Sequence, residues 1–104
     1  MYKVVTPKSD AEFEAYFHFR WEHLRQPWNF PPGSEKDEYE QVAEHRIITN
    51  RKGDIVACGR VHWNTAEEAQ IRHIAVHSDH QRKGLGQMIM AALENVAKDL
   101  GAER

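Results

Sequence analysis

The chain has little of several features that, when abundant, define a class of protein. Its single cysteine, Cys58, cannot form an internal disulfide, and the apolar neighbours of Cys58 predict a small buried side chain. No stretch reaches the ~18 apolar residues of a membrane span, and residues 1–10 lack an apolar export signal. We therefore expect a cytoplasmic protein without membrane contact. The 14 basic and 16 acidic residues nearly balance, which argues against nucleic-acid binding.

Metal-binding motifs are also missing, although the chain has seven histidines. The zinc-binding motif H-E-x-x-H does not occur. His18 and His23 lie five residues apart and do not share a helix face, whereas His62 and His73 could face each other across a hairpin. Two ligands make a poor zinc site, so we predict no metal.

The residues that are present fit one small domain over 1–104, long enough to bury a single core. Residues 2–6 form a predicted strand that Pro7 ends. Ser9 or Asp10 is a good N-cap for a helix that runs to about Arg25, with acidic Glu12 in its first turn. Steps of three and four residues define the inner face of this helix: Phe13, Tyr16, Phe17, Arg20 and Leu24.

The segment after this helix is a loop followed by a polar stretch. Three prolines and a glycine within residues 27–33 exclude regular structure there, and the aromatic rings of Trp28 and Phe30 either cap the edge of the core or form a stiff lid beside a groove. Residues 34–42 predict a short helix capped by Ser34. Its acidic side chains form a solvated face or, beside a groove, attract an amine.

The second half predicts a meander of strands and a long helix. Strands over 45–49 and 55–63 flank a hairpin turn at 50–54, and Gly59 indicates a bulge or the close approach of another element. After a polar turn at 64–68, a strand over 70–76 places Gln70, Arg72, Ile74 and Val76 on one face and His73 on the other. A helix over 85–100 stops at Gly101, with this apolar stripe: Leu85, Ile89, Ala92, Leu93, Val96 and Leu100.

The order β-α-α-β-β-β-α predicts an α+β fold, with helices packed on a mostly antiparallel sheet. Between its last strand and last helix lies the stretch Gln81-Arg82-Lys83-Gly84-Leu85-Gly86. A helix N-terminus offers unpaired N–H groups and a partial positive charge, and glycines let a phosphate approach the backbone. The stretch therefore predicts a pyrophosphate cradle, with a basic turn that binds no ligand as the alternative.

The turn is not a P-loop, because no G-x-x-x-x-G-K-[ST] occurs. It does not fit the dinucleotide fingerprint either, because Ile89 stands where the third glycine of G-x-G-x-x-G would fall. The pattern Q/R-x-x-G-x-G/A after "IRHIAV" resembles the acyl-coenzyme A signature of the GNAT acetyltransferase superfamily. The resemblance implies a GNAT-like fold that lacks its C-terminal β-α-β-β part. Three explanations stay open: a proteolytic fragment, a second polypeptide that completes the domain, or a naturally short chain. We expect a homo-oligomer or a complementing chain rather than a lone monomer.

The resemblance also implies the site. Acetyl-coenzyme A would be the co-substrate, its pantetheine arm lying along Ile74, Ala75 and Val76, with the Val76 backbone N–H as oxyanion donor. The following residues would hold the pyrophosphate: Gln81, Arg82, Lys83, Gly84, Leu85, Gly86 and Gln87. The implied activity is N-acetylation of an amine on a small molecule or peptide.

No general base can be assigned from the sequence. The position that carries a glutamate in histone-modifying members of the family corresponds to Gln70, which cannot act as a base. His73 would lie on the wrong face of a regular strand, whereas Glu67, Glu68 or a water chain could serve. Two other functions stay open: a non-catalytic acyl-coenzyme A-binding module, and an interaction domain that recruits a partner chain at its open strand edge.

Overall fold

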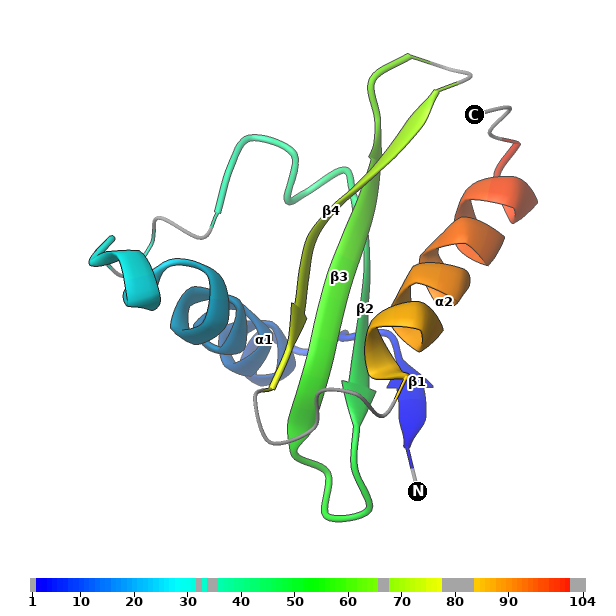
Figure 1. Ribbon diagram of the computed structural model, residues 1–104. Coiled ribbons are helices and arrows are strands. Elements are labelled where there is room, and N and C mark those ends of the chain that lie inside the picture. Colours follow the sequence, from blue (N-terminus) through cyan, green and yellow to red (C-terminus); the bar gives the residue numbers. More distant parts are fainter. Residues whose placement is uncertain (1, 32, 34–35, 66–67, 78–83, 102–104) are drawn as a thin grey trace.

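A computed structural model describes residues 2–31, 33, 36–65, 68–77 and 84–101 as a four-stranded antiparallel sheet with a helix on each face (Figure 1). The elements are β1 (Lys3–Val5), α1 (Asp10–Leu24), the 3-10 turn η1 (Gln26–Trp28), β2 (Glu44–Thr49), β3 (Ile55–Trp63), β4 (Ala69–Val76) and α2 (Leu85–Asp99). The strands lie in chain order, so β1 and β4 are the edges. The predicted α+β fold is confirmed, apart from one helix.

Helix α1 begins where the sequence predicted. Ser9 is its N-cap: the Ser9 hydroxyl accepts a hydrogen bond from the Glu12 N–H (3.1 Å), and the Glu12 carboxylate accepts one from the Ser9 N–H (3.0 Å). This reciprocal pair satisfies two N–H groups that the helix leaves unpaired. Pro27 follows in η1, so part of the predicted loop is a 3-10 turn. Trp28 is 73% exposed, so its ring does not cap the core.

The helix predicted over 34–42 is wrong for the described part of that segment. Residues 38–43 form turns, and Ser34 lies outside the described residues. The acidic segment is only partly solvated, because Glu38 is exposed whereas only 11% of the Glu40 side chain is. Glu40 and Asp37 instead turn inward to pair with arginines. Buried guanidinium groups need carboxylate partners, and this requirement overrides a weak helical tendency.

The hairpin between β2 and β3 matches its prediction. The Asn50 side chain accepts hydrogen bonds from the backbone N–H groups of Lys52 and Asp54, and Gly53 adopts φ 88°. Further along β3, both predictions for Gly59 are confirmed. The pairing with β4 shifts register between Cys58 and Arg60, and a Cβ on Gly59 would lie 2.5 Å from Ile74 Cδ1.

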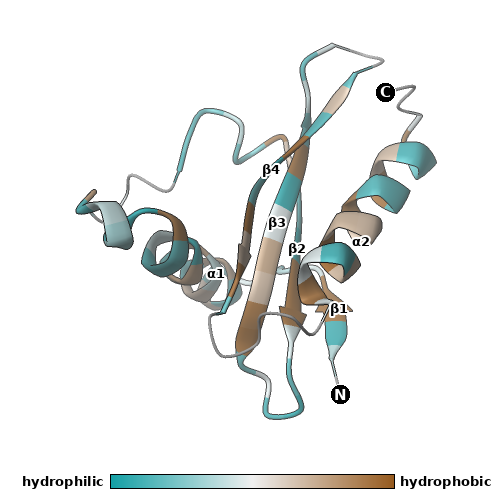
Figure 2. Cartoon of the chain, in the orientation of Figure 1, coloured by the Kyte–Doolittle hydropathy of each residue, from teal (hydrophilic) through white to brown (hydrophobic). Residues whose placement is uncertain are grey.

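The core on the α2 face is built entirely from apolar side chains. Its buried members are Ile48, Val56, Ala57, Val61, Leu85, Ile89, Leu93 and Ala97. Three of them lie at the predicted positions of the α2 stripe, whereas Leu100, expected on that stripe, is 59% exposed beyond the end of the helix. Figure 2 shows the hydrophobic colouring concentrated in the half of the sheet near the β2–β3 hairpin.

The α1 face combines apolar and polar burial. Tyr16, Phe19, Ile47, Cys58 and Ala75 form its apolar cluster, which confirms that Cys58 is a small buried side chain. Buried Arg20, His45 and Arg60 lie on the same side of the sheet. Neither α1 nor α2 is long and apolar enough to cross a membrane, and no other described helix is.

Candidate active site

The free edge of β4 carries the predicted pantetheine contacts. The His77 N–H donates to the Val56 carbonyl (2.8 Å), one step beyond the Ala57–Val76 pair of the β3–β4 ladder. Peptide groups along an antiparallel strand point alternately toward the partner strand and away from it. The Val76 N–H and C=O therefore face away from β3, toward the edge where the described residues place no further strand.

A bulge interrupts β4 just before this segment. Arg60 pairs with Arg72 and Cys58 with Ala75, so Gly59 alone lies opposite both His73 and Ile74. His73 has φ 59°, in the left-handed region that non-glycine residues rarely occupy. Gly59 accommodates the bulge, because the space a side chain would need there is filled by Ile74 and Leu93.

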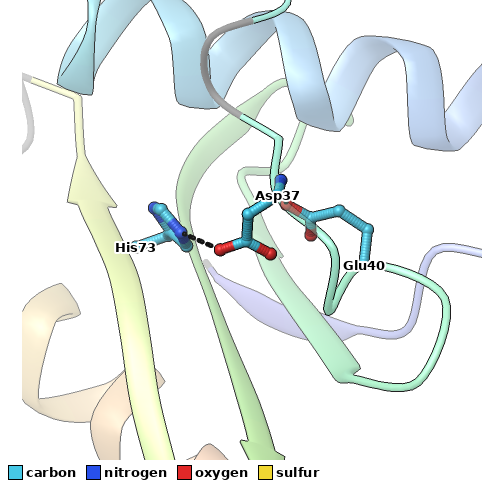
Figure 3. A group of neighbouring side chains, drawn as sticks. All are labelled: Asp37, Glu40 and His73. Atoms are coloured by element: carbon cyan, nitrogen blue, oxygen red, sulfur yellow. Dashed lines mark hydrogen bonds and ion pairs between the residues drawn. The ribbon is translucent and has the colours of Figure 1, made fainter.

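The bulge corrects the predicted faces of β4. Ile71 packs against the α2 core before the bulge, and Ile74 and Val76 pack against it afterwards. Ile74 therefore does not share a face with Arg72, which pairs across the strand with the α1-side Arg60. His73 contacts Asp37 on the α1 side, so it lies opposite Ile74 and Val76 as predicted but shares the face of Arg72, which the prediction placed on the other side (Figure 3). The change from odd to even apolar positions in "AQIRHIAV" was the signal for this bulge.

The N-terminus of α2 comes next to this edge. Gly84 is its N-cap, with φ 78°, and it offers no side chain to bond the first N–H groups of the helix. The first turn holds no acidic residue. A Cβ on Gly86 would lie 3.9 Å from Val76 Cγ2, so two parts of the predicted site meet here. Leu85 is buried in the core and Gln87 is exposed. Gln81, Arg82 and Lys83 lie outside the described residues.

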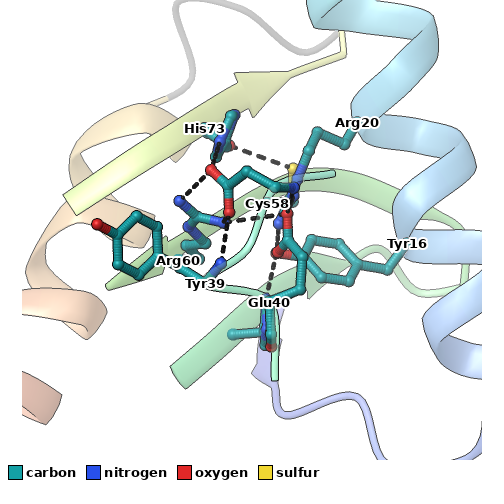
Figure 4. Close-up of polar contacts among 9 residues, drawn as sticks. Tyr16, Arg20, Tyr39, Glu40, Cys58, Arg60 and His73 are labelled. Carbon is teal, nitrogen blue, oxygen red and sulfur yellow. Dashed lines mark hydrogen bonds and ion pairs between the residues drawn. The ribbon is translucent and has the colours of Figure 1, made fainter. Parts of the chain in front are cut away.

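A buried polar network lies on the α1 face behind β4 (Figure 4). Arg60 donates to both carboxylate oxygens of Asp37, at 2.6 and 2.7 Å, and also pairs with Glu40 at 3.0 Å. Arg20 donates to Glu40 at 2.6 Å. Both arginine side chains are fully buried. These bonds attach the turn that carries Asp37 and Glu40 to the sheet and to α1.

Hydrogen bonds extend the network to β2. Arg20 donates to the Tyr16 hydroxyl, which lies 2.7 Å from His45 Nδ1, and His45 Nε2 lies 2.8 Å from the Glu40 carbonyl oxygen. A carbonyl only accepts, so Nε2 carries the proton of His45 and Nδ1 accepts from Tyr16. Burial lowers the pKa of His45, which is consistent with this neutral form.

The charges of this network shift its titrating groups. The hydrogen bonds and charge of Arg60 hold the pKa of Asp37 well below its usual range. Burial raises the pKa of Glu40, but bonding to Arg20 outweighs it and leaves that pKa lowered. Burial, together with the charges of Arg20 and Arg60, lowers the pKa of His73 to about 4. His73 is therefore neutral near pH 7, while both carboxylates are ionised.

Asp37, Glu40 and His73 together form a group with metal-ligand chemistry, since one ligand atom from each lies within 4.8 Å of the others (Figure 3). Arg60 and Arg20 already neutralise the two carboxylates, so the group is better described as an ion-pair network. The other pairing considered from the sequence does not form: His62 lies opposite Gln70 rather than His73. His62 stacks on Tyr39 with ring centroids 4.1 Å apart.

The candidates for a general base are weak ones. His73 Nε2 lies 3.4 Å from Asp37, but a pKa of about 4 makes the imidazole a poor proton acceptor near neutral pH. Gln70 has no basic group. Glu68 lies 3.4 Å from the Asn64 amide in the β3–β4 turn, and Glu67 lies outside the described residues.

Sequence reasoning did not identify the polar network as a unit. Its pairs are far apart in the chain, because Arg60 and Asp37 are separated by 23 positions and Tyr16 and His45 by 29. One local signal was available: Arg20 lies on the inner stripe of α1, where an arginine needs a partner. The acidic stretch that supplies this partner follows shortly in the sequence.

Comparison with known proteins agrees with this geometry. The model of the acetyltransferase (GNAT) family matches residues 13–104, and the chain belongs to that family. The uncharacterised N-acetyltransferase YjcF of Bacillus subtilis is 32% identical over 101 residues, which cover 96% of this chain and 70% of YjcF. The amino-acid acetyltransferase of Pasteurella multocida is 29% identical over 70 residues, 66% of this chain and 16% of that protein.

The fold is also that of solved relatives. An acyl-CoA N-acyltransferase from Pseudomonas aeruginosa superposes with a TM-score of 0.80 at 19% identity, over 99% of this chain and 73% of that one. The family and the two acetyltransferase relatives support acyl transfer as the general chemistry.

Proposed function

We propose that this protein transfers an acetyl group from acetyl-coenzyme A to an amine of a small molecule or peptide. The amine nitrogen attacks the thioester carbon, the C–S bond breaks, and coenzyme A leaves as the thiol after the nitrogen gives up a proton. The observation that carries the proposal is the outward direction of the Val76 N–H, next to the open N-terminus of α2. An N–H fixed in this way stabilises the oxyanion without reorganising.

The cofactor contacts follow from the same arrangement. The outward-facing peptide group of Val76 is suited to pairing with a pantetheine amide, and we assign a second such contact to the backbone of Ile74, while the Ala75 peptide serves the β3 ladder. Gly84, Leu85, Gly86 and Gln87 would contribute backbone N–H groups to the pyrophosphate, and Gln81, Arg82 and Lys83 complete the proposed cradle. The Ile74, Val76 and Leu85 side chains belong to the core, so their contribution would be from the backbone alone.

The chain offers a matched pair of variants for the cradle. Arg82-Lys83-Gly84 and Arg51-Lys52-Gly53 have the same three residues, and the second group lies in the β2–β3 hairpin. We expect charge reversal at Arg82 and Lys83 to weaken acetyl-coenzyme A binding at least about tenfold by calorimetry, because charge-assisted contacts are lost. The same reversal at Arg51 and Lys52 should leave binding unchanged. Equal effects in both places would reject the cradle.

A second variant tests the oxyanion donor directly. Val76→Pro removes an N–H that takes no part in the ladder, so an edge strand should tolerate it. We expect kcat in a thiol-release assay to fall by about 10²-fold or more. Val76→Ala, which keeps the N–H and loses side-chain packing, is the control. A kcat for Val76→Pro equal to that of Val76→Ala would exclude this N–H as the donor.

One observation favours a second function, a non-catalytic acyl-coenzyme A-binding module. The pKa of His73, at about 4, and the amide at Gln70 leave the described site without a good base. Acetyl-coenzyme A binding without thiol release across a panel of amines would support this alternative.

The proposed acetyltransferase also has an expected location and assembly. We propose that it is cytoplasmic and that a second copy or a complementing chain binds at the β4 edge. Sedimentation of the native polypeptide as a stable lone monomer would reject the assembly.

A further inference from the structure

A pocket borders the bulge of β4 on the side away from the cradle. It has a volume of about 410 Å³ and is lined by Leu24 and Arg25 at the end of α1 and by residues 70–74 of β4. One of its lining residues, Ile74, lies two residues before Val76 in the strand. The pocket is therefore close to the proposed oxyanion donor and shares one lining residue, Ile74, with the proposed cofactor contacts.

The charged side chains that line this pocket are both arginines. Among the described residues, no carboxylate pairs with Arg25 or with Arg72, and no acidic side chain lines the pocket. Arg72 is exposed on β4. The Arg25 guanidinium carbon lies 5.8 Å from the Phe30 ring centroid, a contact that helps fix its position.

The wall behind the pocket is balanced in charge. Arg20 and Arg60 are paired there with Asp37 and Glu40, so the pocket keeps the net positive charge of Arg25 and Arg72. Burial is the main cause of the low pKa of His73, and the charges of Arg20 and Arg60 lower it further. The imidazole itself therefore adds no charge near pH 7.

We propose that this pocket binds the acceptor and that the acceptor is an anionic amine, a primary amine bearing a carboxylate or a phosphate, whose anion is held by Arg72 and Arg25. The proposal rests on the proposed acetyl transfer. Guanidinium groups bind both anions through paired N–H donors, which a neutral amine would leave unused. The same positive surroundings lower the pKa of an acceptor ammonium, which favours the neutral nucleophile where no strong base is available.

The test compares acceptors that differ only in the anion. The native polypeptide is assayed for thiol release from acetyl-coenzyme A with alanine against alaninamide, and with glucosamine 6-phosphate against glucosamine. We expect the anionic member of at least one pair to have the higher kcat/KM, by about tenfold or more. The pair that responds distinguishes a carboxylate from a phosphate.

Variants then locate the anion. Arg72→Gln should abolish the preference for the anionic acceptor by raising its KM, while the KM for acetyl-coenzyme A stays the same. Arg25→Gln should reduce the preference by a smaller factor. Arg51→Gln, in the hairpin, removes one positive charge at a distance and should change none of these values. Circular dichroism confirms that each variant is folded.

The outcomes separate this inference from the proposed function. Thiol release with no preference for anionic acceptors, or a preference that Arg72→Gln leaves intact, overturns the inference while acetyl transfer stands. If no amine yields thiol, acetyl transfer by this protein fails, and calorimetry decides the pocket on its own. Binding of glucosamine 6-phosphate or alanine that Arg72→Gln weakens tenfold supports an anion site, and binding that Arg72→Gln does not change rejects it.

Discussion

The two faces of the sheet hold their helices by different means. On the α2 face, Ile48, Ile89 and Leu93 belong to a cluster of buried apolar side chains. On the α1 face, Arg20 and Arg60 are fully buried and reach carboxylates on the turn after η1. Apolar packing tolerates the exchange of one apolar side chain for another of similar size. A buried ion pair is costly to desolvate and is stable only when each charged group has its counterpart.

This difference assigns the two faces different roles. The α2 face supplies the burial that stabilises the fold and holds the cradle helix against the sheet. The α1 face fixes the turn around Asp37 and Glu40 beside β4, where acceptor specificity is expected. A buried ion pair contributes little net stability compared with apolar residues. Removing one partner nevertheless destabilises the fold strongly, because the other charge stays buried without a counterpart. The comparison can therefore be tested by single and paired substitutions.

The largest effect is expected on the α1 face. Arg60→Ala leaves Asp37 and Glu40 short of their shared partner, and should lower the free energy of unfolding by about 4 kcal/mol in urea denaturation. The double variant Arg60→Met with Asp37→Leu should recover most of this loss, because no unpaired charge remains. Arg51→Ala in the hairpin is the control. A loss below ~1 kcal/mol for Arg60→Ala would show that the network contributes little to order.

A somewhat smaller effect is expected on the α2 face. Leu93→Ala opens a cavity in the apolar core and should cost about 3 kcal/mol in the same denaturation experiment. Leu100→Ala removes the same atoms from a side chain that is 59% exposed and should cost less than ~0.5 kcal/mol. Similar losses from the two leucine variants would contradict the apolar core described for this face.

The smallest of the three effects is a pH dependence confined to the α1 face. The pKa of His73 is lowered to about 4 in the folded protein from the ordinary histidine value of 6.5, so the unfolded chain binds the proton first. The stability that His73 contributes is complete above pH 6.5 and is lost as the pH falls toward 4, by on the order of 2 kcal/mol. His73→Gln should flatten this part of the profile of unfolding free energy against pH. An unchanged slope would show that His73 is not desolvated.

Other titrating groups cause the part of the pH dependence of unfolding free energy that His73 does not. His45 also has a lowered pKa and loses stability in the same direction as the pH falls. Asp37, whose folded pKa is depressed, contributes stability above its unfolded pKa of about 4 that is lost in more acidic solution. His18→Gln, at a side chain that is 64% exposed, is the matched control for the loss of an imidazole.

The fold was largely predictable because its signals are local. Ser9 with Glu12 specifies the start of α1, the turn at 50–54 specifies a hairpin, and the apolar steps from Leu85 specify α2. Gly59 indicated a close approach before any partner was known. The cradle stretch and the segment through Val76 identified the family from short patterns, and the family is confirmed.

The candidate site was only partly predictable, since its other half depends on pairings between distant segments. Glu40 was assigned to a solvated helix because nothing near it in the sequence shows that Arg20 and Arg60 lack partners without it. Strict alternation placed Arg72 on the face of Ile74 and opposite His73, whereas the extra residue in the strand puts Arg72 and His73 on the same face. The pocket of Arg25 and Arg72 exists only once α1 is packed beside β4.

The bulge in β4 also determines which length changes this strand can accept. Without His73 the strand would read Ala-Gln-Ile-Arg-Ile-Ala-Val, an uninterrupted alternation that keeps Ile71, Ile74 and Val76 directed toward α2. Deleting another interior residue would instead transfer the side chains on one side of the cut to the opposite face. His73 is thus the extra residue of an otherwise regular strand. Deleting it would change the edge that faces the proposed acceptor and leave the core side chains on their present face.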